Sequence, residues 1–134
     1  MASGFVLIRF WHPKRDLTFL SSLLSMQCFR SWTAGSSRET PLGDKLDGTY
    51  SESYWVSQLE FPGELGFREK LVFAIDRLRR VKKDIHEFNS SGGRIEIYLQ
   101  LSGAINNGDT IENELMKTMG ELGVDLLIEV FPNT

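Results

Sequence analysis

Apolar and polar residues alternate with a period of two along short stretches of the chain, as expected of strands that bury one face. The expected strands are residues 5–11, 27–32, 54–61, 94–101 and 124–131. The alternation is clearest in 94–101, where isoleucine or leucine occupies every second position and Glu96, Tyr98 and Gln100 lie between them. A sheet of such strands has one apolar face and one more polar face.

Apolar residues that recur at steps of three and four predict three helices between these strands. The longest helix covers 64–89, and charged residues fill its other face. A short helix begins at Asp16, whose carboxylate can accept hydrogen bonds from the first free amides. Another begins at Asp109, which stands three positions before Glu112 as in a capping box, and it ends at Gly123.

The resulting order, β-α-β-β-α-β-α-β, predicts an α+β fold in one domain of 134 residues. Two β-α-β crossovers and a central β-β step indicate a ferredoxin-like βαββαβ core with an added αβ unit. Helices are expected on one face of a mostly antiparallel five-stranded sheet. The other, open face should carry polar and aromatic side chains, namely Arg9, Trp11, Glu96, Tyr98, Gln100, Leu127 and Glu129.

Residues 33–53 form a long, polar, glycine-bearing connection, and loops of this length are more often functional or mobile than merely connecting. Trp32 and Trp55 flank this loop. Tryptophan buries a large area and is often a core residue. Tryptophan and arginine together at a loop mouth, however, are frequent anchors for partners or ligands. The candidate binding residues are Trp11, Arg30, Trp32, Arg38, Trp55 and Tyr98.

Composition argues against several classes of partner. With 15 basic and 18 acidic residues the formal charge is −3, so the chain has no general attraction to nucleic acid or anionic membranes. Basic residues gather in 77–83, but carboxylates interleave with them, which favours a solvated helix face. The single cysteine, Cys28, excludes an internal disulfide and a cysteine-rich zinc site. No stretch approaches the ~20 apolar residues of a membrane span, and we expect a cytoplasmic protein.

No catalytic site is predicted, because a nucleophile needs a neighbouring base. Cys28 lies in an expected strand, whereas His12 and His86 belong to other elements and are expected at the surface. Asp44 and Asp47 match a calcium loop only loosely, and no glycine-rich phosphate loop occurs. We therefore expect neither an enzyme nor a metal or cofactor.

The chain also carries a set of motifs along most of its length. They are a strand at 5–10, an Asp-initiated helix with paired leucines at 16–24, a strand leading to a Trp and a Gly at 29–35, and a Trp-bearing strand at 54–59. A strand ending near Ser102-Gly103 and the sequence Leu122-Gly123-Val124 follow. This arrangement resembles the small bacterial domains grouped as domain of unknown function 4279. Members often have a proline shortly before the first of these tryptophans, where this chain has Met26-Gln27-Cys28-Phe29.

The resemblance implies a fold and a bacterial setting, and some members of that group look like immunity proteins encoded beside toxins. The leading hypothesis is therefore a non-enzymatic domain that binds a protein partner, such as a toxin that it neutralises. One alternative is a small molecule or peptide bound at the loop mouth near Trp32 and Trp55, with Arg30 or Arg38 holding an anion. Self-association through the open sheet face and an unrecognised enzyme are the others.

Overall fold

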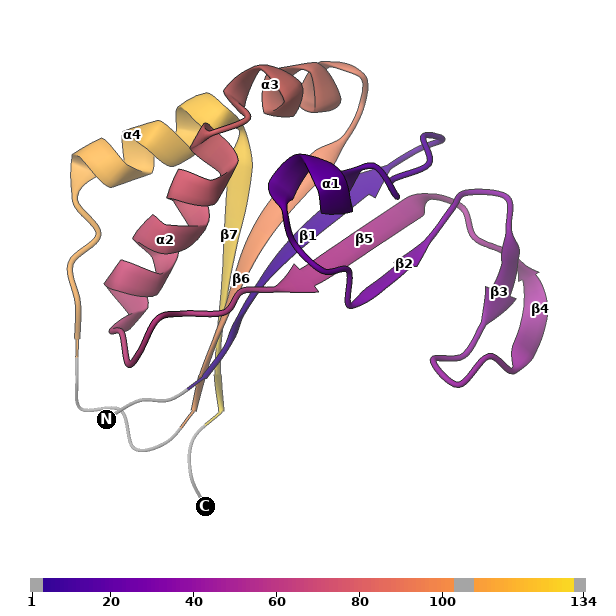
Figure 1. Cartoon of the computed structure of the whole chain (residues 1–134), viewed down its shortest axis with the longest axis horizontal. Helices are drawn as coiled ribbons and strands as arrows, with labels where there is room; N and C mark the ends of the chain where they lie inside the picture. The colour runs from indigo at the N-terminus through magenta and orange to yellow at the C-terminus, as the bar shows by residue number, and fades with distance from the viewer. Residues whose placement is uncertain (1–3, 103–107, 132–134) are drawn as a thin grey trace.

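The computed structural model describes residues 4–102 and 108–131, which form helices and strands of both kinds (Figure 1). In chain order these are β1 (Val6–His12), α1 (Leu20–Leu24), β2 (Arg30–Trp32), β3 (Ser37–Glu39), β4 (Lys45–Thr49), β5 (Ser53–Gln58), α2 (Phe67–Arg79), α3 (Lys82–Ser90), β6 (Arg94–Ser102), α4 (Asn113–Leu122) and β7 (Val124–Phe131). None of the helices in the described ranges has the length and apolar character needed to cross a bilayer.

Five strands form the main sheet in the order β2-β5-β1-β6-β7, while β3 and β4 form a separate hairpin. The strand β1 pairs antiparallel with both β5 and β6, and β2 pairs antiparallel with β5. The last pair, β6 with β7, is parallel. The expected α+β fold with a five-stranded sheet is confirmed, and the sheet is mixed.

The alternation of apolar residues places the core on one face of this sheet. Register pairs Ile8 with Ile97 and Phe10 with Ile95, and all four side chains are fully buried. All four helices contribute buried residues to this core cluster, and Figure 1 shows them on the same side of the sheet. Each fully buried side chain of this size stabilises the fold by about 1.5–3 kcal/mol relative to exposure.

The opposite face is the open face that the sequence predicts. Arg9 lies opposite Glu96, and Tyr98 lies opposite Leu127 on the neighbouring strand. Gln100 lies opposite Glu129, and Trp11 lies in the same row of alternating positions as Arg9. The prediction that these residues share one face of the sheet is confirmed by their strand positions.

The expected single helix over 64–89 is two helices. Val81, with φ −121° and ψ 39°, lies between α2 and α3 and interrupts the helical backbone. The apolar spacing continues across this break through Leu78, Val81 and Ile85, so the pattern gives no sign of it. After this break α3 carries Phe88 into the core, where its ring packs against Phe10 with centroids 5.2 Å apart.

The expected capping role of Asp109 in the following helix is wrong. The helix α4 begins at Asn113, and the Asp109 carboxylate instead accepts a hydrogen bond from the backbone amide of Arg68 (3.3 Å) in the first turn of α2. Negative charge at this helix end is favourable because the free amides there carry partial positive charge. Asp16 does accept a hydrogen bond from Thr18 (2.9 Å), although the helix α1 itself begins only at Leu20.

Candidate functional site

The open face carries a row of aromatic rings and arginines, which we call the aromatic–arginine band. Its members come from four strands of the main sheet and from the residue after β4. They are Arg9, Trp11, Arg30, Trp32, Tyr50, Tyr54, Arg94 and Tyr98. Pairing of β2 with β5 and of β5 with β1 sets Trp32 opposite Tyr54, and Tyr54 opposite Trp11. The backbone register therefore builds the band.

Trp32 is the centre of the aromatic contacts. Its ring stacks on Tyr50 with centroids 4.5 Å apart and planes 8° from parallel, and it lies 4.6 Å from the Tyr54 ring at 31°. Tyr54 in turn contacts Trp11 at 5.5 Å. The indole nitrogen of Trp32 donates a hydrogen bond to the Glu52 carbonyl (3.1 Å). These contacts hold the rings in fixed positions, as in a preorganised binding surface.

The arginines of the band lie over its rings. The guanidinium carbon of Arg94 is 4.1 Å from the Trp11 ring centroid, and that of Arg30 is 4.9 Å from the Trp32 centroid. Arg9 lies 5.0 Å from Trp11 and forms an ion pair with Glu96 at 2.8 Å. Each cation–π contact of this kind contributes about 0.5–1 kcal/mol at an exposed site.

Two tyrosines of the band keep their protons far above neutral pH. Burial raises the pKa of Tyr54, against the opposing effect of the nearby Arg9 charge. Burial also raises the pKa of Tyr98, and the hydrogen bond and negative charge of Glu129 act in the same direction. The band therefore presents neutral phenol groups, which can both donate and accept hydrogen bonds.

The structure brings together four of the six candidate binding residues: Trp11, Arg30, Trp32 and Tyr98. Arg38 lies apart on the hairpin, exposed, and donates a hydrogen bond to the Asp47 carbonyl (3.2 Å). The remaining candidate, Trp55, lies on the other face of the sheet.

Trp55 is a core residue, so the expectation that it frames one loop mouth with Trp32 is wrong. Its side chain is fully buried and meets Phe10 edge-on, with centroids 5.6 Å apart. Its indole nitrogen donates a hydrogen bond to the Ser21 hydroxyl (3.2 Å). Because Trp32 pairs with Tyr54, Trp55 must point to the opposite side.

Four members of the band were not among the candidate binding residues. Arg9 was predicted only for the open face, whereas Tyr50, Tyr54 and Arg94 were not predicted at all. Two of them carry a signal, because Tyr54 occupies the alternate position to Trp55, and Arg94 continues the row of Glu96 and Tyr98. Tyr50 lies in a polar stretch without apolar alternation, and nothing local marks it as a partner of Trp32.

The expected loop over 33–53 contains a hairpin. Ser37 pairs with Thr49 across β3 and β4, and Gly48 adopts φ 85°, which favours glycine. A cavity of about 600 Å³ separates this hairpin from β2, and its wall includes Arg30, Trp32 and Tyr50. This cavity corresponds to the loop mouth that the sequence points to, without Trp55.

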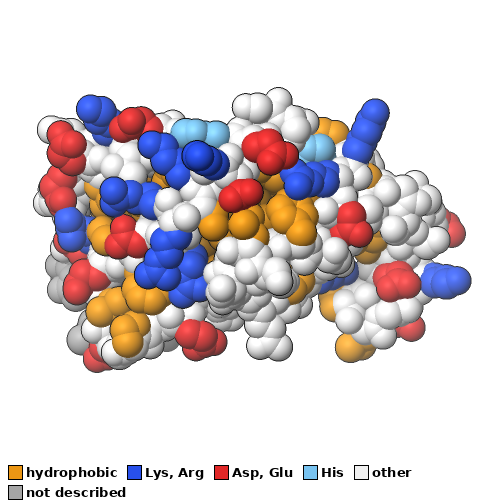
Figure 2. All heavy atoms as spheres, turned by 45° about the horizontal axis from the view of Figure 1, so that its top comes forward, with side chains coloured by type: hydrophobic (Ala, Val, Ile, Leu, Met, Phe, Trp, Pro, Cys, Tyr) orange, Lys and Arg blue, Asp and Glu red, His pale blue; other side chains and the backbone are white. Residues whose placement is uncertain are grey.

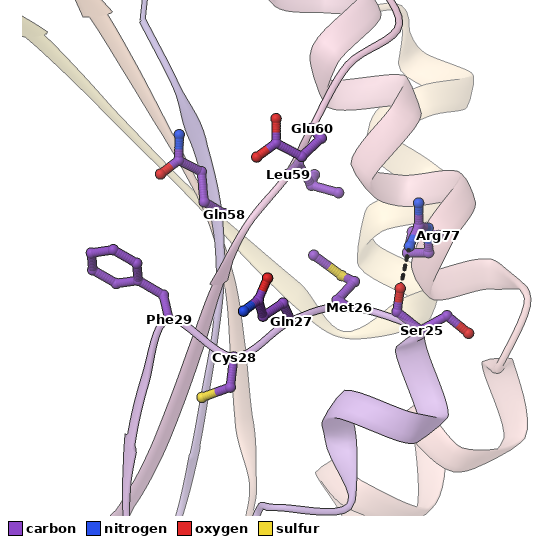
Figure 3. A pocket seen from close by; sticks show the side chains of 9 residues that line it. All are labelled: Ser25, Met26, Gln27, Cys28, Phe29, Gln58, Leu59, Glu60 and Arg77. Atoms are coloured by element: carbon purple, nitrogen blue, oxygen red, sulfur yellow. Dashed lines mark hydrogen bonds between the residues drawn. The ribbon is translucent and has the colours of Figure 1, made fainter.

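A second cavity, of about 430 Å³, lies beside the chain that enters β2 (Figure 3). Its charged lining side chains are Glu60 and Arg77, and the Arg77 guanidinium donates hydrogen bonds to the carbonyls of Leu24 (3.1 Å) and Ser25 (3.4 Å). Cys28 is half-buried at its wall. Arg77 therefore closes the end of α1 and is already engaged within the chain.

His12 is buried, at 8% exposure, and the expectation of a surface residue is wrong for it. Its Nδ1 accepts hydrogen bonds from the amides of Lys14 (3.1 Å) and Arg15 (2.9 Å), and its Nε2 lies 3.0 Å from the Ser91 hydroxyl. His86 is exposed, as expected. The His12 ring thus has a structural task, because it satisfies two backbone donors in the turn after β1.

Within residues 4–102 and 108–131, no group of three or more His, Cys, Asp and Glu side chains is arranged to hold a metal ion. On the face seen in Figure 2, Lys and Arg side chains are mixed with Asp and Glu. Comparisons with protein-family models, curated proteins and solved structures find no match to this chain.

Proposed function

We propose that this chain is a non-enzymatic domain that binds a protein partner through the aromatic–arginine band. The observation that supports the proposal is the gathering of Trp11, Trp32 and three arginines on the one sheet face that the helices leave uncovered. Tryptophan, tyrosine and arginine are enriched at the energetic centres of protein interfaces. Rings that already hold one another in place lose little conformational entropy on binding.

The chemistry of the band favours a protein over a nucleic acid. Trp32 already has Tyr50 and Tyr54 against it, which leaves its ring poorly placed to stack on an unpaired base. The arginines also have acceptors within the chain: Arg9 pairs with Glu96, and the Arg94 guanidinium lies 4.0 Å from the Glu52 carboxylate. Mixed charges of this kind suit a partner surface that has both signs.

We further interpret β1, β2, β5 and β6 as a ferredoxin-like core, with α4 and β7 as the added αβ unit. The strand order β2-β5-β1-β6 with antiparallel pairing throughout supports this interpretation. The resemblance to domain of unknown function 4279 adds the proposal of a cytoplasmic bacterial protein whose partner is a toxin.

Quantitative affinity purification tests the function. Tagged wild type, Arg94→Glu and Trp11→Ser are compared as baits in native lysate, and Lys83→Glu on α3 is the matched control because Lys83 is exposed on the helix side. A protein held in equal amounts by wild type and the control, and lost from both band variants, supports the proposal. A partner that both band variants retain, or the absence of any such protein, contradicts it.

The cavity between β2 and the hairpin supports a second candidate, an anionic small molecule or peptide. The Arg30 guanidinium lines this cavity and donates one hydrogen bond to the Glu39 carbonyl (3.0 Å), so further N–H groups remain for a carboxylate or phosphate. A thermal-shift screen of anionic metabolites on wild type and Arg30→Gln tests it. A ligand that stabilises only the wild type favours this candidate, and no shift in either protein excludes it.

A further inference from the structure

The last strand, β7, forms the edge of the main sheet opposite β2 (Figure 1). It pairs along one side with β6, and no described strand pairs with its other side. The pairing with β6 runs without a register shift from Val124 to Phe131. Its outer edge is therefore long and regular, and it presents free backbone donors and acceptors.

The helix-side face of β7 is apolar and largely uncovered over its second half. Val124 is buried at 7% exposure against α4, but Ile128 is 45% exposed and Val130 is 53% exposed. Leu99, the register partner of Ile128 on β6, is only 1% exposed. The apolar surface of the sheet thus continues onto β7 beyond the cover that the helices provide, and an added strand would extend it.

The open-face positions of β7 have a different chemistry. Asp125 and Glu129 lie there with Leu127 between them, and both carboxylates are exposed. The segment 124–131 contains neither lysine nor proline, which are common protective residues on edge strands. Along its length the edge therefore offers carboxylates on one face and branched apolar side chains on the other.

We propose that β7 binds, by strand addition, an extended protein segment in which basic residues alternate with apolar ones. Its basic side chains would lie beside Asp125 and Glu129, and its apolar side chains would lie beside Ile128 and Val130, as cross-strand neighbours do. A second copy of this chain fits less well, because pairing β7 with itself brings four carboxylates onto the same face. The inference rests on the edge of the sheet and not on the rings of the band, although Glu129 also forms a hydrogen bond with Tyr98 of the band.

The test measures binding of labelled, end-capped eight-residue peptides by fluorescence anisotropy. The probe alternates lysine and valine, and one control peptide has glutamate in place of every lysine. A second control keeps the lysine–valine sequence but carries an N-methyl group on every backbone amide, which removes the strand-pairing donors on both edges of the peptide. We expect the lysine–valine peptide to bind at least about tenfold more tightly than either control, a difference of about 1.4 kcal/mol.

Variants of the protein locate the binding to β7. Val130→Lys places a charge on the apolar side of the edge and is expected to weaken binding at least about tenfold. Asp125→Asn with Glu129→Gln is expected to abolish the preference for lysine over glutamate without perturbing the core, since both carboxylates are exposed. Leu46→Lys on the exposed hairpin strand is the matched control and should bind like the wild type.

Three outcomes overturn the inference. Equal binding of the N-methylated peptide excludes strand addition, and equal binding to Val130→Lys places the peptide elsewhere. Sedimentation of the wild type as a stable dimer that Val130→Lys disrupts would show that the edge is occupied by a second copy of the chain.

Discussion

Trp32 and Tyr50 lie face to face, with ring centroids 4.5 Å apart and planes 8° from parallel. One residue ends β2 and the other follows β4, so the stack joins the hairpin to the edge of the main sheet. The Tyr50 hydroxyl also accepts a hydrogen bond from the Glu39 amide (3.0 Å) and donates one to the Glu39 carbonyl (3.1 Å). Every residue of β3 and β4 is exposed, so the hairpin has no buried core of its own. The aromatic stack holds it against the main sheet instead.

Tyr50→Ala is therefore expected to loosen the hairpin while leaving the sheet intact. The lost ring contact is worth about 0.5–1.5 kcal/mol beyond its buried area. Hydrogen–deuterium exchange should become faster in residues 36–50 and stay unchanged in β1 and β6. Tyr50→Phe keeps the stack and removes only the hydroxyl, so its effect should be intermediate. Unchanged protection in Tyr50→Ala would show that other contacts hold the hairpin.

The main sheet could be predicted because its signal is local. Ile95, Ile97 and Leu99 alternate with Glu96 and Tyr98, and a period of two along one strand determines which side chains face the core. The hairpin gives no such signal, because both of its short strands are exposed on both faces. Its aromatic contact with the sheet is the stack of Tyr50 on Trp32, and Trp32 belongs to a different strand, β2.

The composition of the band was only partly predictable for a related reason. In β5 an aromatic residue occupies each of two successive positions, Tyr54 and Trp55, so alternation alone does not decide which one faces the core. The pairing of Trp32 with Tyr54 settles the question, and that register belongs to a strand of three residues with little pattern of its own. The pairing of β2 with β5 therefore decides which of the two rings faces the core, and local periodicity does not.

His12→Phe is expected to destabilise the fold although it preserves an aromatic ring. The substitution leaves the amides of Lys14 and Arg15 without their acceptor in a partly buried turn. Such losses cost about 1–3 kcal/mol in the free energy of unfolding. Urea denaturation measures the change. His86→Phe is the control: it removes only an exposed hydrogen bond between the His86 ring and the Glu121 carbonyl (3.0 Å), and its effect should stay within about 0.5 kcal/mol. Equal effects of both substitutions would contradict a role for the His12 acceptor.

Two glycine-to-alanine substitutions should have opposite effects. At Gly93 an added Cβ would overlap the ring of Phe88, which is 2% exposed and packs on Phe10, so a loss of about 1–3 kcal/mol is expected. At Gly120, within α4, nothing lies within 4 Å of an added Cβ, and alanine should stabilise by about 0.5–1 kcal/mol. Thermal unfolding of both variants measures this. A stable Gly93→Ala protein would mean that the Phe88 ring can move aside.

The ion pair between Arg68 and Glu112 should make stability depend on acid pH. Arg68 donates two hydrogen bonds to this carboxylate, at 2.6 and 2.5 Å, and they lower the pKa of Glu112 from its ordinary value of 4.5. A carboxyl whose pKa is lower in the folded state stabilises the fold above its unfolded pKa, and this contribution is lost as the pH falls through the folded pKa. The pH window in which this stabilisation is lost therefore lies below 4.5, the ordinary pKa of this carboxyl.

Glu112→Gln tests this dependence. The variant should be less stable than the wild type near neutral pH. The difference should shrink as the pH falls through that window, because the wild-type carboxyl becomes protonated and uncharged there. Urea denaturation over a series of pH values measures both proteins, with Glu64→Gln as a control at an exposed carboxyl. A difference that stays constant down to about pH 3 would mean that Glu112 acts through its shape and neutral hydrogen bonds, because the charge of its carboxylate would then contribute nothing to stability.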